Sequence, residues 1–448
     1  MTQPSPAIER SSTESLLTRG LPTKLSERET KSDTKTVLII SHNHPQFFPG
    51  GAEIFAYDLF KAIKECDGYN AFFLAGVAGH SREMRPGTPF QTIGDASDEI
   101  LFWGNLFDLF YQSQQNFHAL YIEFKELISQ VNPDIIHFHH TLRIGLEALQ
   151  VVRNTLPNVK IVYTLHEFIL MCHNGGQMIT TQTKELCEFP SPDKCSRCFP
   201  DYTPQQFKMR ELFIKSHTAL VDHFISPSHF LANRFVEWGI PKSDITVLEN
   251  GRQLQPQAPF RPLPPGRSVR NRFGYFGQVN PFKGVLLVLK AVELLTKSGY
   301  DDFRLDIFGG VTNGFPEFKD SFYSFLDKYQ DNVSYHGEYK QSEIPELISL
   351  IDWVIVPSTW WENSPLVIQE VFMHRRPILC SNIGGMAEKV SDRKTGLHFR
   401  ARSHTSLAQK MEEAIEQPKL WDELVSNIMP RLSMQESVSE HLSLYEAL

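Results

Sequence analysis

Short runs of apolar residues alternate with longer stretches of helical periodicity along most of this chain. A first series of apolar runs covers residues 36–40, 71–74, 134–138, 160–164 and 223–225, and a second covers residues 272–276, 304–308, 333–336, 353–356 and 377–380. Runs with few polar positions are typical of strands that are buried on both faces of a parallel sheet. Their alternation with helical stretches predicts an α/β protein with parallel sheets.

A proline-rich segment separates the two series of strands. Residues 253–268 are rich in Gln and Arg, and their prolines are Pro256, Pro259, Pro262, Pro264 and Pro265. This composition is typical of a linker. The sequence therefore predicts two doubly wound, Rossmann-like domains, residues 36–252 and 269–420, that face each other across a cleft. Residues 421–448 are predicted to form a C-terminal helix that packs back on the first domain.

Length and composition set the class of protein. A chain of 448 residues is long enough for two domains, and 41% hydrophobic and 21% charged residues describe an ordinary globular protein. The net charge of −8 argues against a nucleic-acid partner, and no apolar run is long enough for a membrane span. Residues 1–35 are polar, without the apolar core of a signal peptide, and are predicted to be a disordered tail. The predicted location is the cytoplasm.

The most informative chemistry lies in residues 357–370. Pro365 fits the first turn of a helix that begins near Leu366, which places Glu362 in the preceding loop and Glu370 on the second turn. The free amide groups at the start of this helix favour an anion, and they belong to Asn363, Ser364 and Leu366. Pro365, which has no amide hydrogen, lies among them and is counted with the predicted donor-binding residues. Two carboxylates that flank an anion cradle suit a sugar joined through a diphosphate to a ribose.

Two glycine-containing turns add further phosphate chemistry. Gly277, at the end of the predicted strand 272–276, permits close backbone approach, and Lys283 supplies a positive charge before the next helix. Gly50 and Gly51 occupy the corresponding turn of the first predicted domain. Each feature alone is also compatible with an ordinary turn or with a solvated lysine.

These motifs together resemble retaining glycosyltransferase family 4, whose members have the GT-B fold and use nucleotide-diphosphate sugars. Residues 362–370 resemble its Glu-x7-Glu signature, and residues 277–284 resemble its Gly-x5-Lys-Gly segment. The resemblance implies that Glu362 meets the donor sugar and that Glu370 meets the ribose. Many relatives carry Arg where this chain has Gln278, so one phosphate-binding cation is missing while Gln278 still donates hydrogen bonds.

The first predicted domain carries the other family segments. Residues 50–53 resemble Gly-Gly-Ala-Glu, and residues 164–167 resemble Thr-Leu-His-Asp, with Glu167 in place of Asp. The resemblance places His166 near the donor sugar, and the predicted catalytic residues are His166, Glu362 and Lys283. His139, in the cluster of His137, His139 and His140, is a candidate acceptor-side group.

Four cysteines follow His166 with the spacing Cys-x14-Cys-x7-Cys-x2-Cys: Cys172, Cys187, Cys195 and Cys198. They lie in a predicted loop, residues 171–200. Such spacing suits a structural zinc ion, while free thiols and disulfides are the alternatives. A subset of family 4 carries a similar cysteine-bearing insertion. No metal is expected to take part in catalysis.

The function predicted from these features is retaining transfer of a sugar from a nucleotide-diphosphate sugar to a hydroxyl acceptor, in polysaccharide or glycoconjugate assembly. The acceptor is expected to be a glycan or a lipid-linked molecule. The aromatic stretch 100–111 is compatible with two interpretations: a segment of the hydrophobic core, or a surface that makes a peripheral contact with a membrane. Two other functions stay open: a nucleotide-sugar epimerase of the same fold, and a non-catalytic binding protein organised by the cysteine loop.

Overall fold

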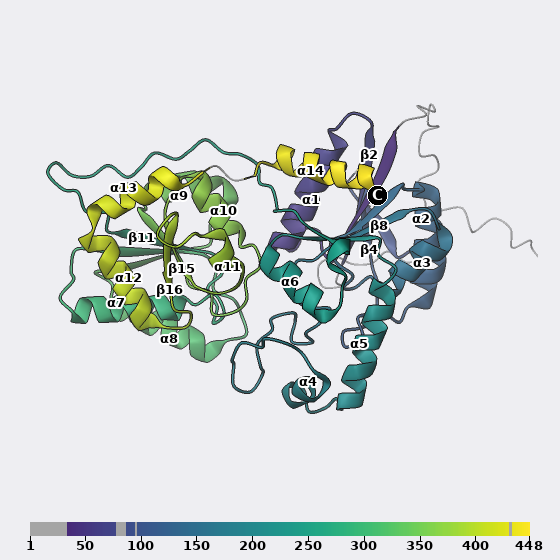
Figure 1. Ribbon diagram of the computed structural model, residues 1–448, viewed down its shortest axis with the longest axis horizontal. Coiled ribbons are helices and arrows are strands. Elements are labelled where there is room, and N and C mark those ends of the chain that lie inside the picture. The colour runs from purple at the N-terminus through teal and green to yellow at the C-terminus, as the bar shows by residue number, and fades with distance from the viewer. Residues whose placement is uncertain (1–33, 78–86, 95, 430–431) are drawn as a thin grey trace, which may run out of the picture.

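The structure is a computed structural model that describes residues 34–77, 87–94, 96–429 and 432–448. The predicted disordered tail lies outside these ranges except for its last two residues, and Lys35 already begins the first strand. Two separate sheets, each flanked by helices, form the two halves of the molecule (Figure 1). Among the described residues, no helix is long and apolar enough to cross a membrane.

The first sheet has eight strands in the order β10-β9-β8-β7-β1-β2-β4-β3, and all neighbours are parallel except β3 and β4. Its strands are β1 (Lys35–Ser41), β2 (Tyr69–Gly76), β3 (Phe90–Ile93), β4 (Ala96–Phe102), β7 (Ile135–Phe138), β8 (Lys160–Thr164), β9 (His223–Ser226) and β10 (Ile245–Val247). A separate hairpin pairs β5 (Phe107–Asp108) with β6 (Ser113–Gln114). Around them lie α1 (Gly51–Lys64), the π-helix Ala119–Phe124, α2 (Lys125–Val131), α3 (Glu147–Thr155), α4 (Pro192–Cys198), α5 (Pro204–Thr218), α6 (His229–Trp238), the 3-10 helix Lys242–Asp244 and α14 (Met434–Ala447).

The second sheet has six parallel strands in the order β13-β12-β11-β14-β15-β16. They are β11 (Arg272–Phe276), β12 (Arg304–Phe308), β13 (Val333–Gly337), β14 (Trp353–Val356), β15 (Ile378–Ser381) and β16 (Gly396–Phe399). The helices of this half are α7 (Val285–Lys297), α8 (Pro316–Lys328), the 3-10 helix Gln341–Glu343, α9 (Ile344–Ser349), α10 (Leu366–Met373), α11 (Gly384–Lys389), α12 (His404–Glu416) and α13 (Pro418–Asn427).

Both faces of each sheet are buried, which explains the unbroken apolar runs of the sequence. In β1, Leu38 and Ile40 belong to one core, and Val37 and Ile39 belong to the core on the opposite face. The strands of the second sheet divide between two cores in the same way. Each strand predicted from sequence is present, and the predicted doubly wound α/β class is confirmed. Strands β3, β4, β10 and β16 of the two sheets and the hairpin strands β5 and β6 were not predicted.

The segment predicted to be a linker packs against the second half of the molecule. Residues 253–268 form no helix or strand, but Ala258 is buried beside the second sheet. Arg376, which is fully buried, donates hydrogen bonds to the carbonyl groups of Ala258 and Pro259. Arg261 forms an ion pair with the buried Asp352 at 2.6 Å. These contacts hold the segment at a fixed place on the surface.

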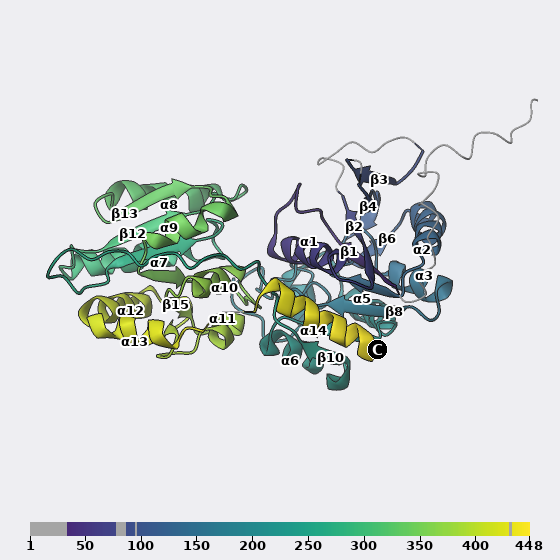
Figure 2. The ribbon, with the colours of Figure 1, turned by 90° about the horizontal axis from the view of Figure 1, so that it is seen from above.

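The C-terminal residues 421–448 form two elements where the sequence predicted one helix. Trp421 and the rest of α13 pack into the second core, whereas α14 crosses back and lies beside α1 on the first half (Figure 2). The helix is interrupted because Ser433 forms a capping box with Glu436, which starts a new helix. At this crossing the backbones of Arg252 and Ser433 pair, so the chain passes between the two halves twice, side by side.

The aromatic stretch 100–111 is divided between core and surface. Phe102 and Trp103 are fully buried, which fits the core interpretation for this part of the stretch. Leu106 and Leu109, beyond the end of β4, are exposed.

Helix α14 is fastened to the first sheet by a buried hydrogen bond. The hydroxyl of Tyr445 lies 2.6 Å from Nδ1 of His137, and Nε2 of His137 lies 2.7 Å from Oγ1 of Thr164. We expect Tyr445→Phe to lower the free energy of unfolding by about 2 kcal/mol, because it leaves a buried imidazole without its partner. Urea unfolding measures the change. Tyr69→Phe is the matched control, since its bond to Glu446 is exposed and its loss should be nearly neutral; equal effects of the two variants would contradict this assignment.

Candidate functional site

A cavity of about 620 Å³ lies between the two sheets and is lined by residues of both halves. It sits at the carboxyl ends of the parallel strands, where ligands of such sheets bind. Every residue predicted to be catalytic or donor-binding lines it: Gly50, Gly51, His166, Gly277, Gln278, Lys283, Glu362, Asn363, Ser364, Pro365, Leu366 and Glu370. These residues are far apart in sequence, so the fold alone brings them to one place.

Glu362 accepts hydrogen bonds from three side chains at the wall of the cavity. Its Oε1 atom lies 2.6 Å from Nζ of Lys283 and accepts hydrogen bonds from Oγ of Ser358 and Nε1 of Trp360, each at 2.7 Å. Burial alone would raise the pKa of Glu362, but the charge of Lys283 and these hydrogen bonds lower it below its usual value. Glu362 is therefore ionised at neutral pH.

The structure places the start of α10, predicted to bind an anion, at the wall of this cavity, with one change in detail. Pro365 is the residue that precedes the helix, with ψ of 119°, and the first helical residue is Leu366. The sequence predicted Pro365 inside the first turn; its extended ψ places it just outside. Among the described residues, Oδ1 of Asn363 and Oγ of Ser364 are buried without a hydrogen-bond partner. Buried polar atoms without partners at a helix start can form hydrogen bonds with a bound ligand.

Two glycines allow the backbone to lie close to this cradle. Gly277 has φ of +129°, a conformation that side chains disfavour, and a Cβ atom there would meet nothing within 4 Å. The space beside Gly277 is thus open to a ligand. Gly51 lies against the other half of the molecule, since its Cβ atom would stand 3.3 Å from the side chain of Leu366.

Glu370 is paired with a residue that the sequence did not suggest. Nη2 of Arg252 lies 2.6 Å from Oε1 of Glu370, and Nε2 of Gln341 lies 3.4 Å from the same atom. Burial raises the pKa of Glu370, and Arg252 opposes that shift. No periodicity or motif marks Arg252 in the sequence, because its position follows from the crossing of the two connections between the halves.

The wall contributed by the first sheet is made of histidine–carboxylate pairs. Nε2 of His42 lies 3.0 Å from Glu53, and Nε2 of His140 lies 3.2 Å from Glu167. Burial opposes ionisation of Glu53, yet the hydrogen bond and charge of His42 lower its pKa to about 2. Burial raises the pKa of Glu167 to about 8. Both His42 and His140 were missed as site residues, although His140 belongs to a cluster that the sequence singled out.

His166 connects the two halves of the site. Nδ2 of Asn363 donates a hydrogen bond of 2.8 Å to the carbonyl oxygen of His166, and the imidazole lies 3.0 Å from Nδ1 of His139. Burial lowers the pKa of His166 to about 3, so the ring is neutral. His139 lies behind His166 and is buried; it does not line the cavity. His140, which the sequence did not select, lines the cavity instead.

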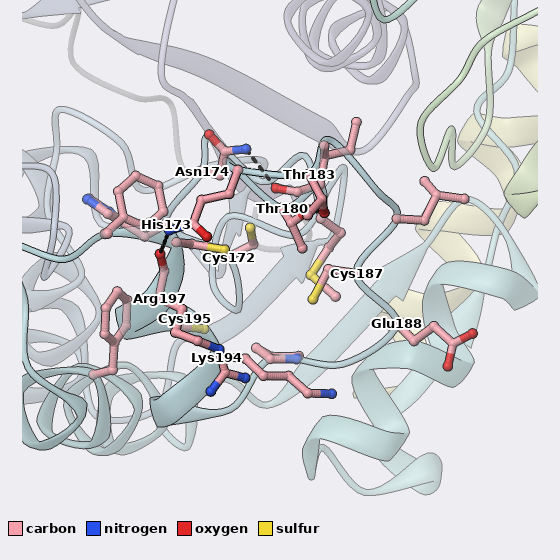
Figure 3. Close-up of a pocket in the computed structure, with 18 residues that line it drawn as sticks. Cys172, His173, Asn174, Thr180, Thr183, Cys187, Glu188, Lys194, Cys195 and Arg197 are labelled. Atoms are coloured by element: carbon pink, nitrogen blue, oxygen red, sulfur yellow. Dashed lines mark hydrogen bonds between the residues drawn. The ribbon is translucent and has the colours of Figure 1, made fainter. Parts of the chain in front are cut away.

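The four loop cysteines lie around a second cavity, of about 420 Å³ (Figure 3). All four are free thiols. Within the described part of the chain, no group of three or more His, Cys, Asp or Glu side chains is placed to hold a metal ion. The carbonyl oxygen of Cys187 accepts a hydrogen bond of 3.2 Å from Nε1 of Trp361, so this loop touches the segment that carries Glu362.

Two parallel doubly wound sheets with a ligand cavity between them define the GT-B fold. Among solved structures, that of HepE from Anabaena in complex with UDP has a TM-score of 0.64 and 15% identity, and the match covers 93% of this chain and 100% of that one. This likeness establishes the fold.

Two family models match the two halves of the chain in turn. Residues 49–255 match "Glycosyltransferase Family 4", and residues 265–429 match "Glycosyl transferases group 1". The chain belongs to this family of GT-B glycosyltransferases, which use nucleotide-sugar donors.

The curated relatives match parts of the chain. An alpha-D-kanosaminyltransferase of Streptomyces kanamyceticus is 26% identical over 186 residues, 38% of this chain and 45% of that protein. A D-inositol 3-phosphate glycosyltransferase of Arthrobacter sp. (strain FB24) is 23% identical over 309 residues, 67% of each chain. The chain thus spans about half the length of the first of these relatives.

The Lys283–Glu362 ion pair gives the site a defined pH dependence. We expect Lys283→Met to lower the free energy of unfolding by about 2 kcal/mol at neutral pH, because a mostly buried carboxylate loses its partner. The folded-state pKa of Glu362 lies below its unfolded value, so the pair stabilises the protein above about pH 4.3. Its contribution disappears as the pH falls through the folded-state pKa.

Urea unfolding of wild type and Lys283→Met across this pH range tests the pair. The difference between them should shrink on acidification. The exposed Lys290 supplies the matched control, Lys290→Met, which should unfold like the wild type at every pH. A difference that stays constant or grows at acidic pH would show that Lys283 does not keep Glu362 ionised.

Proposed function

We propose that this protein is a retaining glycosyltransferase that moves a sugar from a nucleotide-diphosphate sugar to a hydroxyl of a glycan or lipid-linked acceptor. The observation that carries the proposal is the cavity itself, which gathers an ionised Glu362, Lys283, the start of α10 and Glu370. Assembly of a polysaccharide or glycoconjugate is the setting that we infer from the family.

The donor would lie along the second sheet. Its diphosphate fits the amide groups at the start of α10 and the open space beside Gly277, with Lys283 as the nearby cation. Gln278 would contribute hydrogen bonds without charge. Its ribose hydroxyls would meet Glu370, whose carboxylate is already oriented by Arg252.

UDP is the first nucleotide to test. Solved structures of the same fold, such as that of HepE, contain UDP, and UDP-glucose is bound in another structure of that protein. The fold is shared, but the identity of 16% leaves the base of the nucleotide in this protein to experiment.

Sugar transfer requires the site to stabilise the negative charge that develops on the departing nucleoside diphosphate. Lys283 and the helix start serve this purpose. In the front-side route implied by the family, the bond from the anomeric carbon to the phosphate oxygen breaks. The acceptor oxygen bonds on the same face, and its proton passes to the leaving phosphate. Glu362 orients the sugar, and no covalent sugar–enzyme bond forms.

The acceptor would lie against the wall from the first sheet. The His42–Glu53 and His140–Glu167 pairs offer hydrogen-bond donors and acceptors at the surface of the cavity. Such pairs suit the hydroxyl groups of a sugar. They support a hydroxyl-bearing acceptor over one recognised mainly through a phosphate.

A panel of UDP-, GDP-, ADP- and TDP-sugars tests the donor site. We expect one nucleotide to bind selectively by calorimetry, and Glu370→Ala to weaken that binding about 10-fold, because two ribose hydrogen bonds are lost. Glu346→Ala, an exposed carboxylate on the neighbouring α9, is the control and should bind like the wild type. Absence of binding to every nucleotide would refute the transferase assignment and leave a binding protein. Release of isomerised or free sugar without an acceptor would instead indicate an epimerase.

Glu362→Gln tests the chemical step. The amide keeps the size of the side chain but removes its charge, so we expect turnover to fall about 100-fold. The affinity for the donor should change little, since the phosphate contacts remain. Because the variant loses its ion pair with Lys283, transfer is measured at a temperature where both proteins are folded. Released nucleotide, followed with and without an acceptor, is the measurement. Unchanged transfer in this variant would remove Glu362 from the reaction.

A further inference from the structure

The cysteine loop, residues 171–200, has almost no hydrophobic core of its own. From residue 180 to residue 200 no side chain is buried, and α4 buries none of its residues. A segment that cannot bury apolar surface needs another source of stability. The remaining contacts are mainly hydrogen bonds, such as those from Thr181 to the carbonyl of Cys198 and from Gln182 to the carbonyl of Arg197.

The four thiols of this loop come from separate segments and surround one space. Cys172 follows β8, Cys187 follows a short bridge between Ile179 and Leu186, and Cys195 and Cys198 lie one turn apart on α4. All line the cavity of about 420 Å³, and Figure 3 shows Cys172, Cys187 and Cys195 around it. In the described side-chain positions the sulfur atoms are not gathered around one point, so binding of an ion would require the cysteine side chains to rotate into the cavity.

A buried cation beside the thiols lacks a fixed counter-ion. Arg210 is only 3% exposed, and its guanidinium donates hydrogen bonds to the carbonyl groups of Phe110, Ile169, Leu170 and Met171. In the part of the chain that the structure describes, Arg210 forms no salt bridge with a carboxylate. A buried charge without a partner is costly. Its contacts lie directly next to Cys172.

We propose that Cys172, Cys187, Cys195 and Cys198 bind one structural Zn²⁺ ion with tetrahedral geometry. Zn²⁺ replaces the four thiol protons, which pass to solvent, and the resulting centre carries two negative charges. That charge complements Arg210, as well as Lys194 and Arg197, which line the same cavity. The ion would supply the cross-link that the loop lacks.

The zinc site would also fix a contact between the two halves of the molecule. Besides the bond from Trp361 to Cys187, Nη2 of Arg402 donates a hydrogen bond of 2.6 Å to the carbonyl oxygen of Lys184. Both donors belong to the second half, and Trp361 directly precedes Glu362. An ordered loop therefore holds the wall of the donor cavity from outside, a consequence that rests on the proposed function.

Metal binding to the full-length protein, free of any tag, tests the proposal without any measurement of transfer. After treatment with a chelator, the wild type should bind one equivalent of Zn²⁺ in competition with a chromophoric chelator. Co²⁺ in its place should give the sulfur-to-cobalt charge-transfer absorption of a tetrahedral thiolate site. Zinc should also protect the four loop thiols from alkylation while Cys66 stays reactive; Cys380 is fully buried and should react in neither state of the folded protein.

Single variants separate a built site from adventitious binding. Cys195→Ser should weaken Zn²⁺ binding at least about 100-fold, whereas Cys66→Ser, which removes a thiol outside the loop, should bind like the wild type. Arg210→Met keeps all four thiols and should weaken binding about 10-fold, with Arg210→Lys restoring most of it. Less than one equivalent of zinc in the wild type, or equal affinity in Cys195→Ser, would overturn the proposal even if sugar transfer is found.

Discussion

The burial of both faces of two parallel sheets is the constraint on which the rest of the structure depends. Parallel strands need helical crossovers, and the helices cover both faces. The carboxyl ends of all strands in a sheet then lie on one edge. Because these two edges face each other, the loops after β1, β8, β11 and β14 meet in a single cavity. The position of the site is thus a result of topology.

Charges inside the cavity are arranged in pairs. Glu362 is matched by Lys283, Glu370 by Arg252, and Glu53 by His42. A buried carboxylate without a partner would become protonated or would destabilise the fold. In each pair the carboxylate is already oriented. Ordering these groups when a ligand binds would therefore cost little free energy. The start of α10, in contrast, keeps buried polar atoms of Asn363 and Ser364 unpaired.

Several contacts between the halves lie at the site. Asn363 reaches the backbone of His166, Leu366 packs beside Gly51, and the cysteine loop reaches Trp361. On the far side, the paired backbones at Arg252 and Ser433 tie the two connections together, and α14 anchors the chain end on the first sheet. Relative movement of the halves would therefore act directly on the residues that flank Glu362 and Glu370, where interdomain closure is most useful to a transferase.

The sequence by itself determined the fold class, the strands with unbroken apolar runs and every residue of the predicted donor site that lines the cavity. Buried parallel strands and helix starts leave local signals, and residues such as Glu362 and Lys283 lie within such local motifs. Only the tertiary structure decided their partners: Arg252 for Glu370, His42 for Glu53, and the carbonyl of Cys187 for Trp361. Edge strands β3 and β16 and the division between α13 and α14 were also missed. These features depend on contacts between residues far apart in the chain, and hydrophobic periodicity carries no information about which distant side chains will meet.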